Sequence, residues 1–148
     1  MQVGRQKYPL AQFHFHNPCE HCPEPRPERD LELHLVHHND RGQVAAVVGV
    51  RVSEGGEENA AFKAFLAAAP GGVATLHPRA LLPPEPHGYY HYEGSLTTPA
   101  CTEGMLWHVL KQKLTVSGDQ IDSFLSRYRD TARPLKEREG RRVSQSRD

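Results

Sequence analysis

Residues 10–16 and 31–37 each alternate between hydrophobic and polar side chains, which is the pattern of a β-strand with one face in a core. In the first segment, LAQFHFH, one face carries Gln12, His14 and His16, and two phenylalanines occupy the other face. The two histidines therefore point in the same direction, away from the phenylalanines.

The second segment, LELHLVH, places Glu32, His34 and Val36 on one face and two leucines with a further histidine on the other. A turn signal at residues 39–42 follows, and then the run VAAVVGVRV at residues 44–52. Such a nearly continuous run of small and β-branched residues is typical of a strand buried on both faces. We expect the three segments to form an antiparallel meander.

Apolar residues at helical spacing predict two helices. The apolar positions of the first helix are Ala61, Phe62, Phe65, Leu66 and Ala69. Pro70-Gly71-Gly72 ends this pattern. The apolar positions of the second helix are Ile121, Phe124, Leu125 and Tyr128. Ser117 and Gln120 predict a capping box at its start.

Two further strands are expected at residues 89–92 and 105–114, around a Gly-Ser-Leu-Thr-Thr-Pro loop. Residues 136–148 are rich in charge, and we expect them to form a flexible tail. Together the elements predict a single domain over residues 1–148 that is mostly β with a few short helices.

The composition is that of one globular domain, with 148 residues of which 37% are hydrophobic. Eighteen basic residues balance eighteen acidic ones, so no overall positive field exists to hold nucleic acid or an anionic membrane. The sequence has no apolar run of about 18 residues, the length of a transmembrane helix, and its start has no signal-peptide core. We therefore expect a small-molecule partner, with no nucleic acid and no membrane.

Histidine is the compositional outlier, with ten residues, and the histidines cluster in the first forty positions. The cysteines Cys19, Cys22 and Cys101 are too few and too odd in number for a disulfide scaffold, although one bridge is allowed. The cysteine count therefore leaves the redox compartment open.

The histidines of the two predicted strands have the arrangement of a catalytic zinc site. His14 and His16 lie two residues apart on one strand and His34 lies on the facing strand, so three imidazoles can reach one point. Catalytic zinc keeps its fourth position for a water molecule, whose pKa it lowers to about 7. Gln12 and Glu32 lie on the same faces, where they can accept the remaining ring N–H groups. Taken singly, each histidine is explained equally well as a surface or core residue.

A zinc finger is the competing explanation. The spacing Cys19-x2-Cys22-x11-His34-x3-His38 differs by one residue from that of a finger. A finger needs its histidines on a helix, whereas residues 31–37 alternate as a strand. Prolines also stand where the second strand and the helix of the finger should form. We therefore favour the histidine site over thiolate ligation.

Five segments of the chain together resemble the C-terminal part of the α-class carbonic anhydrases, most like the bacterial members. They are QFHFHNPCEH (12–21), LELHLVHHN (31–39), VAAVVGV (44–50), YYHYEGSLTTPACTEGMLWHVL (89–110) and ARPL (132–135). The resemblance implies a large, twisted, mostly antiparallel sheet that is incomplete at its amino-terminal side. It also implies zinc-dependent, reversible hydration of CO2 to bicarbonate and a proton.

By this resemblance the metal is Zn²⁺ and its ligands are His14, His16 and His34. Gln12 and Glu32 are then the hydrogen-bond partners of the ligand rings, in agreement with the faces predicted for the two strands.

The resemblance assigns catalytic roles to Thr97 and Glu20. The Thr97 hydroxyl donates to the buried Glu20 carboxylate and so accepts a hydrogen bond from the zinc-bound hydroxide, which orients it toward the substrate. Thr98 lies beside the bicarbonate position. The apolar wall that holds CO2 consists of Val36, Val47, Leu96 and Trp107. Core packing explains these four residues equally well.

The chain departs from the family most in length, because eleven residues precede Gln12 where a whole family domain extends well upstream. That upstream part holds sheet strands and, in many members, the histidine that shuttles protons. We therefore expect an exposed sheet edge and slow proton release. If the chain is a fragment of a longer precursor, a periplasmic or secreted location is expected.

Single positions differ as well. Cys19 stands where bacterial relatives usually have serine, Ala100 replaces a proline, and Thr131 replaces an asparagine. Cys101 matches a cysteine that pairs with the upstream region in many secreted relatives. Here it is free, pairs with Cys19 or Cys22, or joins another chain. We also allow for a homodimer, and for an inactive zinc-binding relative as the alternative to an enzyme.

Overall fold

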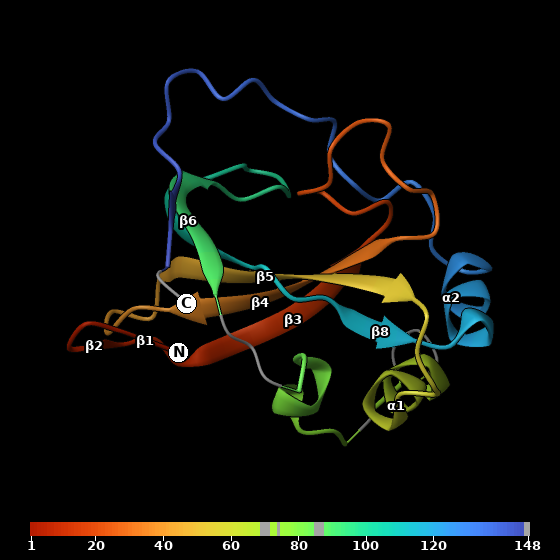
Figure 1. The fold of residues 1–148 in the computed structure, drawn as a ribbon. Helices are drawn as coiled ribbons and strands as arrows, with labels where there is room; N and C mark the ends of the chain where they lie inside the picture. The colour runs from red at the N-terminus through yellow and green to blue at the C-terminus, as the bar shows by residue number, and fades with distance from the viewer. Residues whose placement is uncertain (69–71, 74, 85–87, 147–148) are drawn as a thin grey trace.

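The computed structural model describes residues 1–68, 72–73, 75–84 and 88–146, and strands dominate it (Figure 1). In chain order the elements are β1 (Gln2–Val3), β2 (Gln6–Lys7), β3 (Leu10–His16), β4 (Leu31–His38), β5 (Val44–Glu54), α1 (Ala60–Ala67), the 3-10 helix η1 (Pro78–Leu81), β6 (Tyr89–Ser95), β7 (Glu103–Leu110), β8 (Leu114–Val116), α2 (Gly118–Leu125) and β9 (Ser144–Gln145). The large sheet has the order β3-β4-β5-β7-β6-β9, with β8 paired to β5. The expected fold, a large sheet with a few short helices, is confirmed.

The predicted meander is confirmed. β3 pairs antiparallel with β4, and β4 pairs antiparallel with β5. In the first pair His14 stands opposite His34, and Phe15 stands opposite Leu33. The sheet therefore separates the histidine face of β3 from its phenylalanine face, as the alternation requires.

The sheet is mixed, because β5 pairs parallel with both β7 and β8, whereas β6 pairs antiparallel with β7 and β9. The strand predicted at residues 105–114 is wrong in its extent, since the chain leaves the sheet after Leu110 and returns at Leu114 as β8. β7 lies beside residues 46–49 of β5, and β8 lies beside residues 52–54. The break falls at the polar run Lys111-Gln112-Lys113 between the buried Leu110 and Leu114, and the prediction included this run in one strand.

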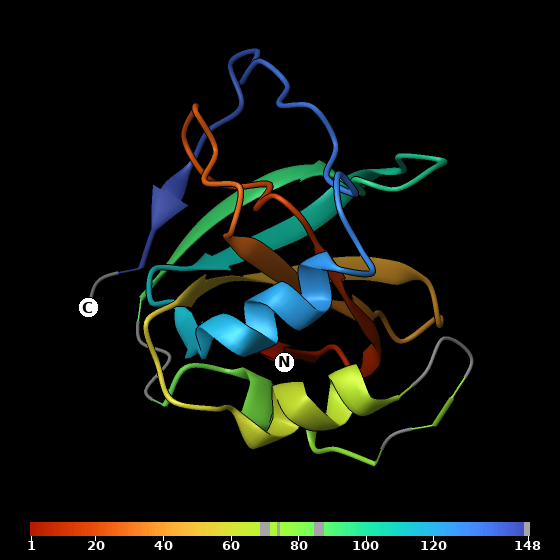
Figure 2. The same cartoon turned by 90° about the vertical axis from the view of Figure 1, so that its right-hand side faces the viewer.

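The main core lies between one face of the sheet and the helices α1 and α2, which lie side by side against it (Figure 2). Phe15 of β3 is central to this core, with its ring centroid 5.2 Å from that of Phe62 on α1 and 5.9 Å from that of Phe124 on α2. Burying a side chain of this size contributes about 1.5–3 kcal/mol. Because Phe15 alternates with the histidines of β3, this packing holds the strand that carries them.

α1 begins after Asn59, whose side chain accepts a hydrogen bond from the backbone N–H of Phe62. The residues predicted to complete and end this helix, Ala69 and Pro70-Gly71, lie outside the described residues. Gly72 is described and lies outside the helix.

α2 begins with the predicted capping box, in which Ser117 and Gln120 exchange hydrogen bonds between side chain and backbone. The helix ends at Leu125, so Tyr128 is not helical as predicted. Its ring nevertheless packs 5.3 Å from that of Phe124, because the core extends past the helix end.

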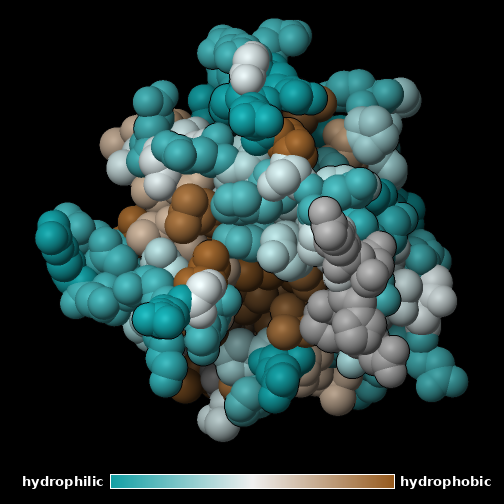
Figure 3. All heavy atoms as spheres, turned by 60° about the vertical axis from the view of Figure 1, so that its left-hand side comes forward, coloured by the Kyte–Doolittle hydropathy of each residue, from teal (hydrophilic) through white to brown (hydrophobic). Residues whose placement is uncertain are grey.

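The sheet ends on one side at β9, which pairs with β6, and on the other at β3. β9 lies within residues 136–148, whose flexibility stays a prediction. Within the described residues no strand lies along the outer edge of β3, where Leu10 is 38% exposed. Figure 3 shows hydrophobic residues in a hollow of the surface, with hydrophilic residues above and below it. None of the described helices is long and apolar enough to cross a membrane.

Candidate metal centre

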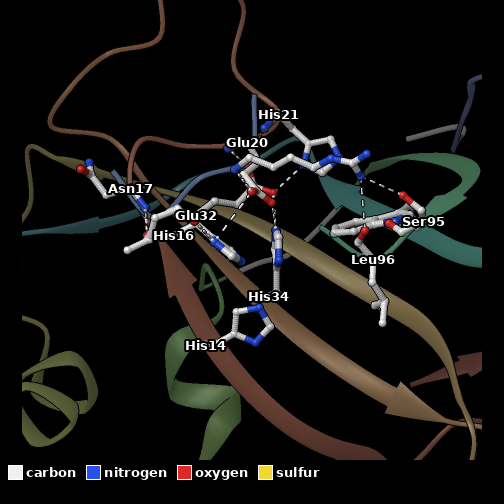
Figure 4. A network of polar contacts seen from close by, with 12 residues as sticks. His14, His16, Asn17, Glu20, His21, Glu32, His34, Ser95 and Leu96 are labelled. Atoms are coloured by element: carbon white, nitrogen blue, oxygen red, sulfur yellow. Dashed lines mark hydrogen bonds and ion pairs between the residues drawn. The ribbon is translucent and has the colours of Figure 1, made fainter. Parts of the chain in front are cut away.

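His14, His16 and His34 gather on the sheet face opposite the main core (Figure 4). Their ring centroids are 4.9, 5.3 and 4.7 Å apart. One ring nitrogen of each lies within 4.8 Å of the others. The two strands thus bring together the three histidines that the sequence predicts, at a spacing that can hold one metal ion.

Two of the rings are oriented by the side chains predicted to do so. His14 Nδ1 lies 2.9 Å from Gln12 Oε1, and His34 Nε2 lies 2.9 Å from Glu32 Oε1. A neutral imidazole that donates its N–H to such an acceptor keeps a lone pair on the other nitrogen. His14 Nε2 and His34 Nδ1 are therefore the nitrogens left for a metal.

The third ring is oriented by the backbone. His16 Nδ1 lies 3.0 Å from the carbonyl oxygen of Thr131, whose hydroxyl oxygen accepts a hydrogen bond from the backbone N–H of Asn17. His16 Nε2 is buried and has no hydrogen-bond partner in the part of the chain that the structure describes. A buried nitrogen without a partner is costly, and a metal ion would satisfy it. The residues present therefore fit a metal ion.

The local electrostatics favour neutral rings. The pKa of His14 is lowered to about 4, first by burial and then by the neighbouring His34 and His16. Burial also lowers the pKa of His34, against the opposing effect of Glu32. Both rings are neutral at pH 7, which is the form of histidine that binds metals.

Glu32 is fully buried and is surrounded by hydrogen-bond donors. The backbone N–H groups of Glu20 and His21 donate to its Oε2 atom over 3.0 and 2.8 Å, and His21 Nδ1 lies 2.5 Å from Oε1. Burial opposes ionisation of Glu32, but the charge and hydrogen bonds of His21 and His34 lower its pKa well below the usual range. Glu32 is therefore a carboxylate that can hold the His34 ring in one tautomer.

His21 and Tyr92 extend this network and were not predicted. Burial opposes protonation of His21, but Glu32 raises its pKa. The other ring nitrogen of His21 lies 2.7 Å from the Tyr92 hydroxyl. Only the position of His21 inside the segment QFHFHNPCEH could have suggested it. Tyr92 and Thr131 lie 71 and 115 residues from their partners, so no local pattern reveals them.

Glu20 is buried beside the histidines, but its predicted partner is not bonded to it. Glu20 Oε1 accepts a hydrogen bond of 2.7 Å from the backbone N–H of Arg133. Glu20 Oε2 is buried and has no hydrogen-bond partner among the described residues; it lies 3.7 Å from His34 Nε2. Thr97 and Glu20 line one cavity of about 780 Å³, yet the hydroxyl of Thr97 makes no hydrogen bond to this carboxylate. The catalytic roles of the two residues stay a prediction.

The predicted apolar wall is a cluster beside the histidines. Val36, Val47 and Trp107 are buried together, and Leu96 packs against them. The ring of Trp107 lies 4.8 Å from that of His34. Thr98, predicted to lie beside bicarbonate, is exposed on the loop after β6. The four residues therefore form a hydrophobic cluster beside the His34 ring, while their contact with substrate stays a prediction.

Gly49 of β5 leaves room for the Glu32 carboxylate. It stands opposite His34, and a Cβ atom at this position would lie 3.1 Å from Glu32 Oε1 and 3.7 Å from the ring of Trp107. A larger side chain there would displace the carboxylate that orients His34.

The zinc-finger alternative is wrong. His34 and His38 lie on strand β4 rather than on a helix. Cys19 and Cys22 form a disulfide with each other, which leaves no thiolate ligands. Cys101, the remaining cysteine of the sequence, is a free thiol.

Comparison with known proteins agrees with the resemblance. A family model described as eukaryotic-type carbonic anhydrase matches residues 1–147. A carbonic anhydrase of Nostoc sp. is 34% identical over 143 residues, which is 91% of this chain and 53% of the relative. This chain therefore spans about half the length of the curated relatives it matches.

Solved structures match as well. An α-carbonic anhydrase of Photobacterium profundum superposes with a TM-score of 0.83 at 35% identity, covering 96% of this chain and 67% of the other. The α-carbonic anhydrase of Thermovibrio ammonificans in complex with the inhibitor sulfanilamide gives a TM-score of 0.81 at 33% identity, covering 95% and 64%. With the family match over nearly the whole chain, these likenesses show that the chain belongs to the eukaryotic-type, or α, carbonic anhydrase family.

Proposed function

We propose that this chain is a zinc-dependent carbonic anhydrase, which hydrates CO2 reversibly to bicarbonate and a proton. The observation that carries the proposal is the buried Nε2 atom of His16, which has no hydrogen-bond partner in the described ranges of the chain. Beside it, His14 Nδ1 and His34 Nε2 already have acceptors, which leaves the second nitrogen of each ring for a metal ion. A zinc ion bound by three neutral imidazoles keeps its full charge and supplies a nucleophile from water near pH 7.

The chain's own residues prepare the site for that ion. Gln12, Glu32 and the carbonyl oxygen of Thr131 each fix one ring, so the histidine nitrogens need little reorganisation to bind. Outer hydrogen-bond partners of this kind typically change metal affinity by about 10-fold to 100-fold.

Thr97 and Glu20 are proposed to orient the nucleophile. Glu20 is a buried carboxyl group, and its Oε2 atom has no hydrogen-bond partner among the described residues, so it could accept a hydrogen bond from the Thr97 hydroxyl across the cavity that both residues line. The hydroxyl would then have only its lone pairs to offer the nucleophile and would accept a hydrogen bond from it. Val36, Val47, Leu96 and Trp107 are proposed to hold CO2 against the site, with Thr98 beside bicarbonate.

The test is a stopped-flow measurement of CO2 hydration with a pH indicator, on protein loaded with one equivalent of zinc. Activity well above the buffer rate, inhibited by sulfanilamide and lost in His34→Ala, supports the proposal. His38→Ala is the matched control, because it removes a neighbouring histidine that lies outside the cluster. Zinc-loaded protein with no activity above buffer contradicts the proposal.

The second candidate is a zinc-binding relative without activity. The missing hydrogen bond between Thr97 and Glu20 favours it. One bound zinc, without CO2 hydration or sulfanilamide binding, is its signature.

Assembly and location are further proposals. The outer edge of β3, which carries no strand within the described residues, supports a homodimer, and light scattering after size exclusion tests it. The Cys19–Cys22 disulfide supports an oxidising compartment such as the periplasm or the exterior of the cell.

A further inference from the structure

The Cys19–Cys22 disulfide closes a short loop whose two inner residues are Glu20 and His21. The Cα atoms of the two cysteines are 5.7 Å apart, within the range that a disulfide spans. Glu20 and His21 are also the residues that surround the carboxylate of Glu32. The disulfide therefore restrains Glu20 and His21, the two residues whose hydrogen bonds hold the Glu32 carboxylate beside the metal-site histidines.

A continuous series of contacts joins this loop to a metal-site ring. The backbone N–H groups of Glu20 and His21 both point to Glu32 Oε2, and the His21 ring binds Oε1. Glu32 Oε1 in turn lies 2.9 Å from His34 Nε2. Two adjacent N–H groups can meet one oxygen only while the backbone keeps this turn, and the disulfide restricts the rotations that would undo it.

Both cysteines of the bridge are buried, with Cys19 0% and Cys22 3% exposed. Only Cys22 belongs to the lining of the cavity of about 780 Å³, together with Glu20 and His21. A small thiol in this cavity would therefore approach the bridge from the Cys22 side.

We propose that Cys19–Cys22 is a reversible redox site that controls how firmly His34 is held for its metal. A thiolate of a small dithiol attacks Sγ of Cys22 and forms a mixed disulfide, and Cys19 leaves as a thiolate that takes up a proton. The second thiol of the dithiol attacks the mixed disulfide and releases Cys22. The dithiol is thereby oxidised to its disulfide and the protein gains two electrons and two protons.

Reduction of the Cys19–Cys22 disulfide is expected to weaken metal binding through the loop that it closes. With the bridge open, Glu20 and His21 gain backbone freedom, their N–H groups hold Glu32 less well, and His34 loses part of its orientation. The proposal rests on the metal site of the proposed function but not on CO2 hydration.

The test uses the full chain carrying Cys101→Ala, so that the pair supplies its only thiols. One sample stays oxidised. The other is reduced with dithiothreitol, which is then removed under nitrogen, and the zinc affinity of both is measured against a chromophoric chelator. We expect two titratable thiols to appear and the dissociation constant for zinc to rise about 10-fold. Oxidised glutathione should restore the original value.

A metal-free readout separates this proposal from the proposed function. In the apo protein, reduction should speed amide hydrogen exchange at Glu20 and His21 at least 10-fold while leaving Leu33 and Val50 of the core strands unchanged. Unchanged exchange and zinc affinity within a factor of two would overturn the proposal. A zinc-loaded protein that fails to hydrate CO2 but shows both redox effects defeats only the proposed function.

The matched control is Cys19→Ser/Cys22→Ser in the same background, which should bind zinc weakly under either treatment. If this variant does not fold, the comparison of the oxidised and reduced samples decides. A second bound zinc in the reduced protein overturns the proposal, because the two thiols with Asp30 would then be metal ligands.

Discussion

Glu32 and His34 stand two residues apart on one strand, and their side chains meet at 2.9 Å between Oε1 and Nε2. A strand presents residues i and i+2 on the same face, so the sequence spacing already places the carboxylate beside the ring. Burial of both side chains excludes water from this contact, and Nδ1 is the ring nitrogen left for a metal ion.

We expect Glu32→Gln to lower zinc affinity about 10-fold to 100-fold, because a neutral amide orients the His34 ring less strongly than a carboxylate does. Chelator competition measures the affinity. Glu57→Gln, at an exposed acidic position, is the control and should bind zinc like the parent protein. Equal affinity in all three proteins would contradict the role assigned to Glu32.

We expect His16→Ala to reduce the bound zinc from one equivalent to none, because two imidazoles are left where three are needed. His38→Ala should keep one equivalent, since His38 lies outside the cluster. Metal analysis of dialysed protein gives the stoichiometry. Zinc retained by the His16 variant would show that the metal binds elsewhere.

We expect Thr97→Ala to reduce the rate of CO2 hydration about 100-fold while zinc binding is unchanged, because the hydroxyl orients the nucleophile without holding the metal. Thr102→Ala is the matched control on the same loop, where Thr102 contributes its backbone carbonyl to Leu96. A Thr97 variant with full activity would remove this residue from the mechanism.

The metal-free protein should lose stability as the pH falls from 6.5 to about 4. Burial lowers the pKa of His37 to about 4, helped by the amino terminus and His108 and opposed by its backbone hydrogen bond to Leu35. The unfolded chain has a histidine pKa of about 6.5, so it binds more protons in this window and is favoured as the pH falls. Urea unfolding of His37→Gln should show a smaller loss across the window. An equal loss in both proteins would contradict this prediction.

We expect Ser117→Ala to lower the free energy of unfolding by about 1 kcal/mol, because the first turn of α2 loses the acceptor for the backbone N–H of Gln120. Ser126→Ala, at the exposed end of the same helix, is the control. Urea denaturation measures both. An equal decrease in the free energy of unfolding of the Ser126 variant would contradict a specific stabilising role for the Ser117 cap.

The sequence alone determined the strands that carry the candidate metal site. Alternation fixes which side chains share a face, so the spacing by itself placed His14, His16, Gln12, Glu32 and His34 on the correct faces of their strands. The same local logic predicted the capping box of α2, since both of its partners lie within one helical turn.

Only the tertiary structure shows which residues far away in the sequence form hydrogen bonds with the histidines of the candidate site. Thr131 fixes the His16 ring from 115 residues away, and Tyr92 meets His21 across 71 residues. The break between β7 and β8 falls at the polar run Lys111-Gln112-Lys113, and only the fold shows that the chain pairs with β5 both before and after it. The periodicity of hydrophobic residues indicates which face of its own strand or helix a residue occupies. Contacts between residues far apart in the sequence depend instead on how the strands and helices are arranged in space. That arrangement is set by the packing of the whole core, which no local pattern of residues contains.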